Sequence, residues 1–339
     1  MPAKGSTERH PCKKAQRVIL GPLLLAAFAL NAVAAEPVFE VPAWAYPGYT
    51  NPPAPGTKPD DVVRRRVDGS DVTFTQAQLS DMFVAPDWFP DRHAPMPAVV
   101  ASGRRPDIHA CAFCHLPDGT GRPENAALAG LPADYIRAQV ADMRNGLRHS
   151  AAGTPYRPSQ LMQQVAATAT DAEIAAAAAY FSSLPMRRKV EVVESARVPA
   201  TEAVRFIYFA VEHGGDEALG TRLIEMPVDP VRHELRDPYL TYRAYVPPGS
   251  LERGKGLANA SSADGRTIAC VACHGPLLRG SGVAPPLAGR SPSYLLRQLL
   301  AFRTGTRAAP GGAAMQPVVA SLGLDDMIAV AAYAGSLEP

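Results

Sequence analysis

The sequence lacks a long apolar run beyond residue 30, and it lacks a strong net charge. Without such a run, no later segment has the length needed to span a bilayer. The formal net charge is +2 and becomes −2 when residues 1–35 are left out, so the chain is not expected to bind nucleic acid. With 47% hydrophobic and 19% charged residues, the 339-residue chain has the composition of a folded protein and a length suited to two or three domains.

Residues 1–35 have the features of a secretory signal peptide. Lys13, Lys14 and Arg17 precede an apolar stretch at 18–30, and small residues suitable for cleavage follow it. We therefore predict that 1–35 is a signal peptide and that the mature protein is periplasmic. A retained leader, acting as an N-terminal membrane anchor, and peripheral association with a membrane are the alternatives.

The rest of the chain divides into four stretches of different composition. Prolines and both tryptophans are concentrated near its start, and two compact stretches flank a connector with alternating apolar residues. The predicted boundaries are an N-terminal extension at 36–91, a first domain at 92–187, a connector at 188–247 and a second domain at 248–339. Because an unstructured loop as long as the connector is uncommon, we predict a few short strands around 190–193 and 206–208.

The two predicted domains are copies of one another. Residues of the first domain recur 159 positions later, with no break across the front half of each copy. The matching pairs are Cys111 and Cys270, His115 and His274, Gly130 and Gly289, Tyr135 and Tyr294, Gln139 and Gln298, and Arg148 and Arg307. Later in each copy the separation becomes 153, which pairs Met162 with Met315. The duplication thus identifies residues with corresponding roles.

Each copy contains the pattern Cys-x-x-Cys-His. The residues are Cys111, Cys114 and His115 in the first copy and Cys270, Cys273 and His274 in the second. This is the attachment pattern of haem c, because two thiols must reach two vinyl groups of one macrocycle while the adjacent imidazole coordinates the iron. We predict two covalently bound haem c groups, with His115 and His274 as axial ligands of the iron.

Two other uses of paired cysteines fit the sequence less well. A redox-active dithiol is expected in a βαβ setting, which the sequence does not show. A structural zinc ion shared by both cysteine pairs is disfavoured because each pair belongs to a separate copy.

The duplication also selects a candidate for the sixth ligand of each iron. Methionine is the usual partner of histidine where a cytochrome shuttles electrons at a raised potential. Met162 and Met315 correspond to one another, whereas Met143 is matched by Phe302. A methionine taken alone is more often a core residue, but this matched pair is predicted to provide the axial ligands.

Helix signals occur at corresponding places in both copies. The stretches 132–144 and 291–303 begin with helix-start residues and repeat apolar residues at spacings of three and four. Thr170 and Glu173 form a capping box before an alanine-rich stretch that runs to Tyr180. The predicted fold class is all-α, with two tandem domains, an irregular proline-rich extension and a connector that holds a few short strands.

These residues resemble the class I cytochromes c, and within them the tandem dihaem type represented by cytochrome c4. The resemblance covers both copies, through Cys-x-x-Cys-His, the Leu-Ala-Gly stretch after it, the Tyr and Gln that follow, and the terminal helix with its tyrosine. It implies that a proline carbonyl before the Leu-Ala-Gly stretch accepts the Nδ1 proton of the axial histidine. Pro285 has this position in the second copy, and Ala126 has it in the first.

The expected function is electron transfer rather than catalysis. The expected partners are redox proteins: a periplasmic dehydrogenase, a cytochrome complex or a terminal oxidase. Two alternatives are a dihaem peroxidase with one exchangeable iron position, and a dihaem subunit of a dehydrogenase or oxidase complex. Arg148 and Arg307 are expected either to neutralise haem propionates or to lie exposed at helix ends.

Overall fold

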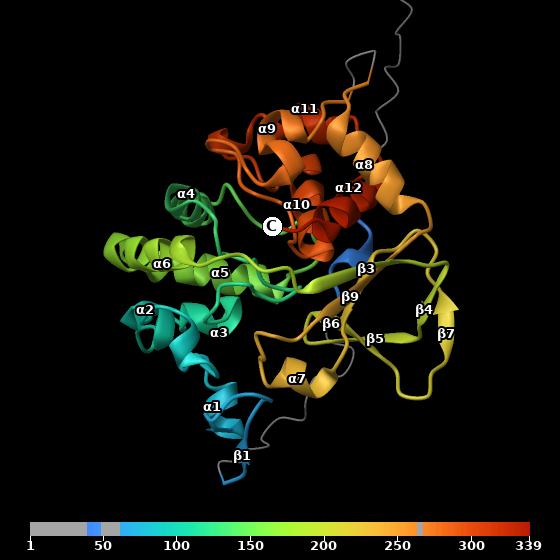
Figure 1. Ribbon diagram of the computed structural model, residues 1–339. Coiled ribbons are helices and arrows are strands. Elements are labelled where there is room, and N and C mark those ends of the chain that lie inside the picture. Colours follow the sequence, from blue (N-terminus) through green and yellow to red (C-terminus); the bar gives the residue numbers. More distant parts are fainter. Residues whose placement is uncertain (1–38, 49–61, 263–266) are drawn as a thin grey trace, which may run out of the picture. The chain divides into compact units, whose positions relative to one another are not determined.

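The structure is a computed structural model that describes residues 39–48, 62–262 and 267–339. The predicted signal peptide at 1–35 and part of the predicted N-terminal extension lie outside the described residues. Residues Phe39–Pro339 form one unit by their contacts, and Figure 1 labels its helices and strands. Among the described residues, no helix is both long enough and apolar enough to cross a membrane.

Five helices form the first helical unit, which carries the first Cys-x-x-Cys-His pattern. They are α2 (Ala98–Ala101), α3 (Cys111–His115), α4 (Ala133–Arg144), α5 (Arg157–Thr168) and α6 (Asp171–Ser183). The helices predicted at 132–144 and from Thr170 to Tyr180 are confirmed by α4 and α6. The Thr170 hydroxyl accepts a hydrogen bond from the Glu173 amide, and the Glu173 carboxylate accepts one from the Thr170 amide, so the predicted capping box starts α6.

The second helical unit repeats α3 to α6 and adds a helix before them. It contains α8 (Ser250–Asn259), α9 (Val271–His274), η3 (Pro276–Leu278), α10 (Pro292–Arg303), η4 (Pro310–Gly312), α11 (Met315–Ala320) and α12 (Leu324–Ser336). The predicted helix at 291–303 is confirmed by α10, which the Ser291 hydroxyl caps. Helix α8 lies directly against α12 (Figure 1), because a Cβ atom at Gly254 would be 2.0 Å from the Ala329 carbonyl oxygen and only glycine permits this approach.

The connector between the two helical units contains short strands and one short helix. They are β3 (Val190–Glu194), β4 (Arg197–Pro199), β5 (Thr201–Val204), β6 (Ile207–Ala210), β7 (Asp216–Ala218), β8 (Ile224–Pro227), α7 (Pro230–Glu234) and β9 (Tyr242–Val246). In one sheet, β9 is the central strand and pairs in parallel with β3 and antiparallel with β8. The other two pairs, β4 with β7 and β5 with β6, are antiparallel. The strands predicted around 190–193 and 206–208 are confirmed by β3 and β6.

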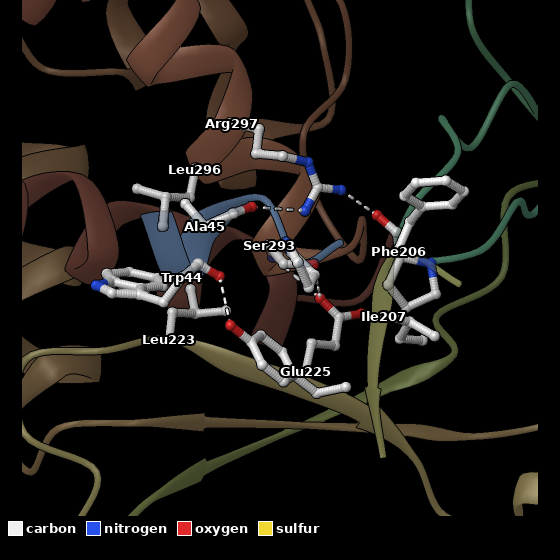
Figure 2. A pocket seen from close by; sticks show the side chains of 12 residues that line it. Trp44, Ala45, Phe206, Ile207, Leu223, Glu225, Ser293, Leu296 and Arg297 are labelled. Atoms are coloured by element: carbon white, nitrogen blue, oxygen red, sulfur yellow. Dashed lines mark hydrogen bonds between the residues drawn. The ribbon is translucent and has the colours of Figure 1, made fainter. Parts of the chain in front are cut away.

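The first described segment of the N-terminal extension packs against α10 and the connector. It contains η1 (Ala43–Ala45). The Arg297 guanidinium donates a hydrogen bond to the Ala45 carbonyl oxygen (3.4 Å), and the Tyr208 hydroxyl donates one to the Trp44 carbonyl oxygen (2.9 Å). Figure 2 shows these residues around a small pocket that η1, α10 and the strands of the connector share.

The later segment of the extension packs on the end of the connector. It contains β1 (Arg64–Arg65), β2 (Phe74–Thr75), α1 (Gln76–Ser80) and η2 (Pro90–Arg92). Trp88 is 1% exposed, its ring meets that of Phe74 edge-on, and its indole Nε1 donates to the Leu235 carbonyl oxygen (2.7 Å). Trp88 therefore fastens this segment to the connector just after α7.

Candidate functional site: two cysteine–histidine attachment sites

Each attachment site is built on one short helix. The first uses Cys111, Cys114 and His115 of α3, and the second uses Cys270 at the start of α9 with Cys273 and His274 inside it. Residues three and four apart on a helix lie on one face, so both sulfur atoms and the imidazole project from the same side. This geometry suits a flat ligand that is bonded at its rim by two sulfur atoms and at its centre by a nitrogen atom.

Among the described residues, the four cysteines of the two attachment sites form no disulfide. Burial raises the pKa of the Cys111 thiol to about 12, and it also raises the pKa values of Cys114 and Cys270. A redox-active dithiol needs a thiol of low pKa, so burial disfavours that alternative. Within residues 39–48, 62–262 and 267–339, no three His, Cys, Asp or Glu side chains gather as a metal-binding group.

The histidines of the two attachment helices are both buried and oriented in the same way. His115 Nδ1 donates a hydrogen bond to the Ala126 carbonyl oxygen (2.8 Å), and His274 Nδ1 donates one to the Pro285 carbonyl oxygen (2.8 Å). Burial lowers the pKa of each imidazole, which favours the neutral form that binds iron. A hydrogen bond at Nδ1 leaves the lone pair of Nε2 for the metal. The expected contact is confirmed in both copies, and alanine supplies the carbonyl as well as proline does.

The interior has an excess of positive charge that fits an anionic cofactor. The buried charged side chains among the described residues are six basic and two acidic: Arg122, Arg148, Lys189, Arg290, Arg297 and Arg307 against Glu225 and Asp237. Buried charges are normally paired, because an isolated ion loses its hydration. A haem carries two propionate carboxylates, so two haems would reduce this excess. The residues present therefore fit haem both at the attachment helices and in their charge.

The duplicated residues Tyr, Gln and Arg meet across the two helical units. Arg148 donates hydrogen bonds to the Tyr294 hydroxyl (2.9 Å) and the Gln298 side-chain oxygen (2.9 Å) of the second unit. Its counterpart Arg307 donates to Tyr135 (2.9 Å) and Gln139 (2.7 Å) of the first unit. Both arginines are only 8% exposed, so the expectation of exposed helix ends is wrong. The arginine of each copy instead binds the tyrosine and glutamine of the other copy, so the contacts between the two copies are symmetric.

The predicted methionine ligands lie at corresponding places in the two units. Met162 is on α5, and Met315 is the first residue of α11. Both side chains are half-buried, and Met315 packs against the core of the second helical unit. Their binding to iron stays a prediction.

Sequence patterns missed a buried polar cluster beside the first site. Arg122 donates a hydrogen bond to the His233 imidazole, whose Nδ1 lies 3.0 Å from the Tyr242 hydroxyl oxygen. Lys189 donates to the Gly121 carbonyl oxygen (3.3 Å), and burial lowers the pKa of its amine to about 8. These residues come from the first copy and the connector, and the duplication does not repeat them, so no signal in the sequence pointed to the cluster.

Comparison with known proteins agrees with this geometry. A family model described as cytochrome c matches residues 107–185 and 251–338, which contain the two attachment sites. The thiosulfate dehydrogenase electron acceptor of Stutzerimonas stutzeri (strain A1501) is 31% identical over 234 residues, which cover 68% of this chain and 80% of that protein. The chain belongs to the cytochrome c family. Its fold is two tandem cytochrome c domains with short strands between them, and its cofactors are two haem c groups.

Other relatives are cytochromes c4, which this chain covers over most of their length. Cytochrome c4 of Azotobacter vinelandii is 26% identical over 245 residues, which cover 71% of this chain and 89% of that protein. A solved structure of cytochrome c4 from Acidithiobacillus ferrooxidans covers 67% of this chain and 98% of its own, with 22% identity and a TM-score of 0.46. This cytochrome is a dihaem electron carrier.

The cysteines, histidines and buried arginines have different roles at a haem site. When bound, haem supplies an iron that exchanges one electron between its ferrous and ferric states. The cysteines of each attachment helix would hold the cofactor in place, and the hydrogen bond from each histidine to a carbonyl oxygen fixes the direction of the imidazole. The buried arginines provide fixed positive charge, which makes it easier for the site to accept an electron.

Proposed function

We propose that this cytochrome accepts electrons in the periplasm from a dehydrogenase that oxidises thiosulfate, and passes them to another cytochrome or a terminal oxidase. The observation that supports this most is the likeness to the thiosulfate dehydrogenase electron acceptor, since it covers 80% of that protein at 31% identity. Oxidation of thiosulfate releases electrons, and each of the two domains takes up one.

The proposal includes the ligands and boundaries expected from the sequence. His115 with Met162 and His274 with Met315 would hold each iron with two protein ligands throughout the redox cycle, which suits outer-sphere transfer. The proposed organisation is a signal peptide at 1–35, an extension at 36–91, domains at 92–187 and 248–339, and a connector at 188–247. The strands of the connector, Val190–Glu194 to Tyr242–Val246, fall inside the last of these boundaries.

Reduction by a purified dehydrogenase tests the proposed donor. The full chain, matured in a host that assembles c-type cytochromes, is mixed with thiosulfate and the thiosulfate dehydrogenase of Stutzerimonas stutzeri, and the spectrum is followed. We expect both haems to become reduced only when enzyme and substrate are both present. If ascorbate reduces the cytochrome fully and the enzyme does not, the proposed donor is wrong.

Ligand replacement tests the proposed iron coordination and separates the carrier from a peroxidase. The variants Met162→Ala and Met315→Ala should each change the spectrum of one haem and allow added imidazole to bind there, whereas the unaltered protein should not bind imidazole at either iron. Imidazole binding to the unaltered protein would instead indicate an exchangeable position, as a dihaem peroxidase requires.

A further inference from the structure

The two attachment sites differ sharply in how much of their outer face is covered. The residue directly before the second cysteine is Phe113 in the first site, where it is 5% exposed, and Ala272 in the second, where it is exposed. Cys114 is half-buried, whereas its counterpart Cys273 is exposed. Because the two sites are copies of one another, this difference results from what surrounds them.

The connector covers the first site. The Arg236 guanidinium lies 3.6 Å from the centre of the Phe113 ring and donates a hydrogen bond to the Phe113 carbonyl oxygen (2.9 Å). The neighbouring Leu235 accepts the hydrogen bond from Trp88, so the extension holds the same piece of connector in place. Directly before the connector, Arg187 pairs with Asp118 of the first site (2.9 Å).

The second site presents apolar side chains to the solvent where the first presents paired acids. Leu277 is 50% exposed and Val283 is 94% exposed, and their counterparts in the first copy are Asp118 and Glu124. Those two acids pair with arginines, Asp118 with Arg187 and Glu124 with Arg122. At these two positions the covered copy thus carries acids that are paired with arginines, and the open copy carries exposed apolar side chains.

The backbone of the second site holds this apolar surface outward. Leu277 has φ +53°, a left-handed conformation that favours glycine and that a leucine adopts at a cost. The chain then folds back, since the Gly280 amide donates to the His274 carbonyl oxygen (2.8 Å), and Val283 lies in the turn closed by the bridge between Ser281 and Ala284. Residues with strained backbone conformations are concentrated at functional sites, so the exposed, strained Leu277 indicates a functional surface.

A positive charge borders the same surface. Arg279 is exposed, and its guanidinium donates to the backbone carbonyl oxygen of Glu338 (3.3 Å). The Glu338 carboxylate is paired with Arg188 instead (2.7 Å). No carboxylate of the described residues forms an ion pair with Arg279, so its charge is available to a partner.

We infer that electron-transfer partners dock on the second attachment face, defined as Ile268, Ala272, Cys273, Leu277 and Val283 with Arg279 at its edge. The occupant is a redox protein that presents an apolar surface around its own cofactor and a carboxylate opposite Arg279. In the first copy the chain's own connector covers the same place through Arg236 on Phe113, which shows that this face of the fold accepts a polypeptide. Electrons then reach the first site through the second.

The test compares apolar residues on the two sides of the molecule. The double variant Leu277→Asp, Val283→Asp alters the second attachment face. The control is Val231→Asp, which places one such charge at another exposed valine (64% exposed) on α7, beside the cover of the first site. All three proteins should contain two haems and have unchanged potentials, which shows that they are folded and loaded.

Two measurements decide the proposal. In the first, electron self-exchange between oxidised and reduced copies is followed by NMR line broadening. We expect the double variant to exchange at least about tenfold more slowly, as the loss of apolar contact and the added charge require, and the control to stay within about twofold. Equal rates in all three proteins, or slower exchange in the control alone, would overturn the proposed docking face.

The second measurement rests on the proposed function and uses the Stutzerimonas stutzeri thiosulfate dehydrogenase as the probe. Amide signals of residues 268–284 should shift when the enzyme is added. The variant Arg279→Glu should weaken its binding and reduce the dependence of the reduction rate on salt. If the enzyme does not bind the unaltered protein, the proposed donor fails, while self-exchange still decides the docking face. If it binds and shifts only signals near α7, the docking face is wrong and the donor stands.

Discussion

Trp88 offers a direct measure of how firmly the extension is fastened to the connector. In the variant Trp88→Phe the ring still packs against Phe74, but the Leu235 carbonyl oxygen loses its hydrogen-bond donor in a buried place. A buried acceptor left without its partner costs about 1–3 kcal/mol, and the smaller ring adds about 1 kcal/mol. The expected loss is therefore about 3 kcal/mol, and Trp88→Ala should lose about 5 kcal/mol.

Hydrogen exchange followed by mass spectrometry measures this loss locally. A loss of 3 kcal/mol corresponds to about a hundredfold faster exchange, which we expect in peptides covering β2, α1 and α7. Trp44→Phe is the control, because the hydrogen bond at Trp44 is accepted by its backbone carbonyl and survives the change. Similar exchange in the two phenylalanine variants would refute the reasoning, since it would mean that the bond to Leu235 contributes little.

Two further predictions concern the helical units. Arg148→Met and Arg307→Met should each lower the free energy of unfolding by about 2–4 kcal/mol. The double variant should lose at least about 1 kcal/mol less than the sum of the two, because the arginine side chains share acceptors and repel one another. Additive losses, measured by unfolding in guanidinium chloride, would contradict this. The hydrogen bond from Arg104, together with the Thr170 amide, lowers the pKa of Glu173 from 4.5 to about 2, so its contribution is complete above pH 4.5 and is lost as the pH falls toward 2. Glu173→Gln should remove this acid dependence from the hydrogen exchange of α6, and an unchanged acid profile would show that Glu173 is not its source.

The sequence predicted those features that depend on local patterns or on the duplication. The capping box at Thr170 involves residues three apart, and the structure confirms it. The contact from His115 to the Ala126 carbonyl oxygen was also predictable, because a backbone acceptor survives the replacement of proline. In each case the partners lie close in sequence, so the pattern alone defines the geometry.

The features that sequence patterns missed depend on contacts between distant segments. The duplication paired Arg148 with Arg307, but it does not reveal that each arginine binds the tyrosine of the other copy. Arg236 has no counterpart in either copy, and its position over the Phe113 ring depends on the path of the whole connector. A repeat in the sequence identifies equivalent residues, whereas their surroundings are decided by segments that are not repeated.

The parallel pairing of β3 with β9 has a consequence for how this architecture tolerates change. Strand β3 follows the first helical unit, and strand β9 precedes α8. The chain therefore leaves one unit and approaches the other along two neighbouring strands that run in the same direction. Residues 195–241 therefore form an excursion that leaves from the Glu194 end of this strand pair and returns at its opposite end, beside Val190. Lengthening or shortening the hairpins within that excursion should leave the spacing of the two redox centres unchanged, so the connector is free to diversify while the electron path stays constant.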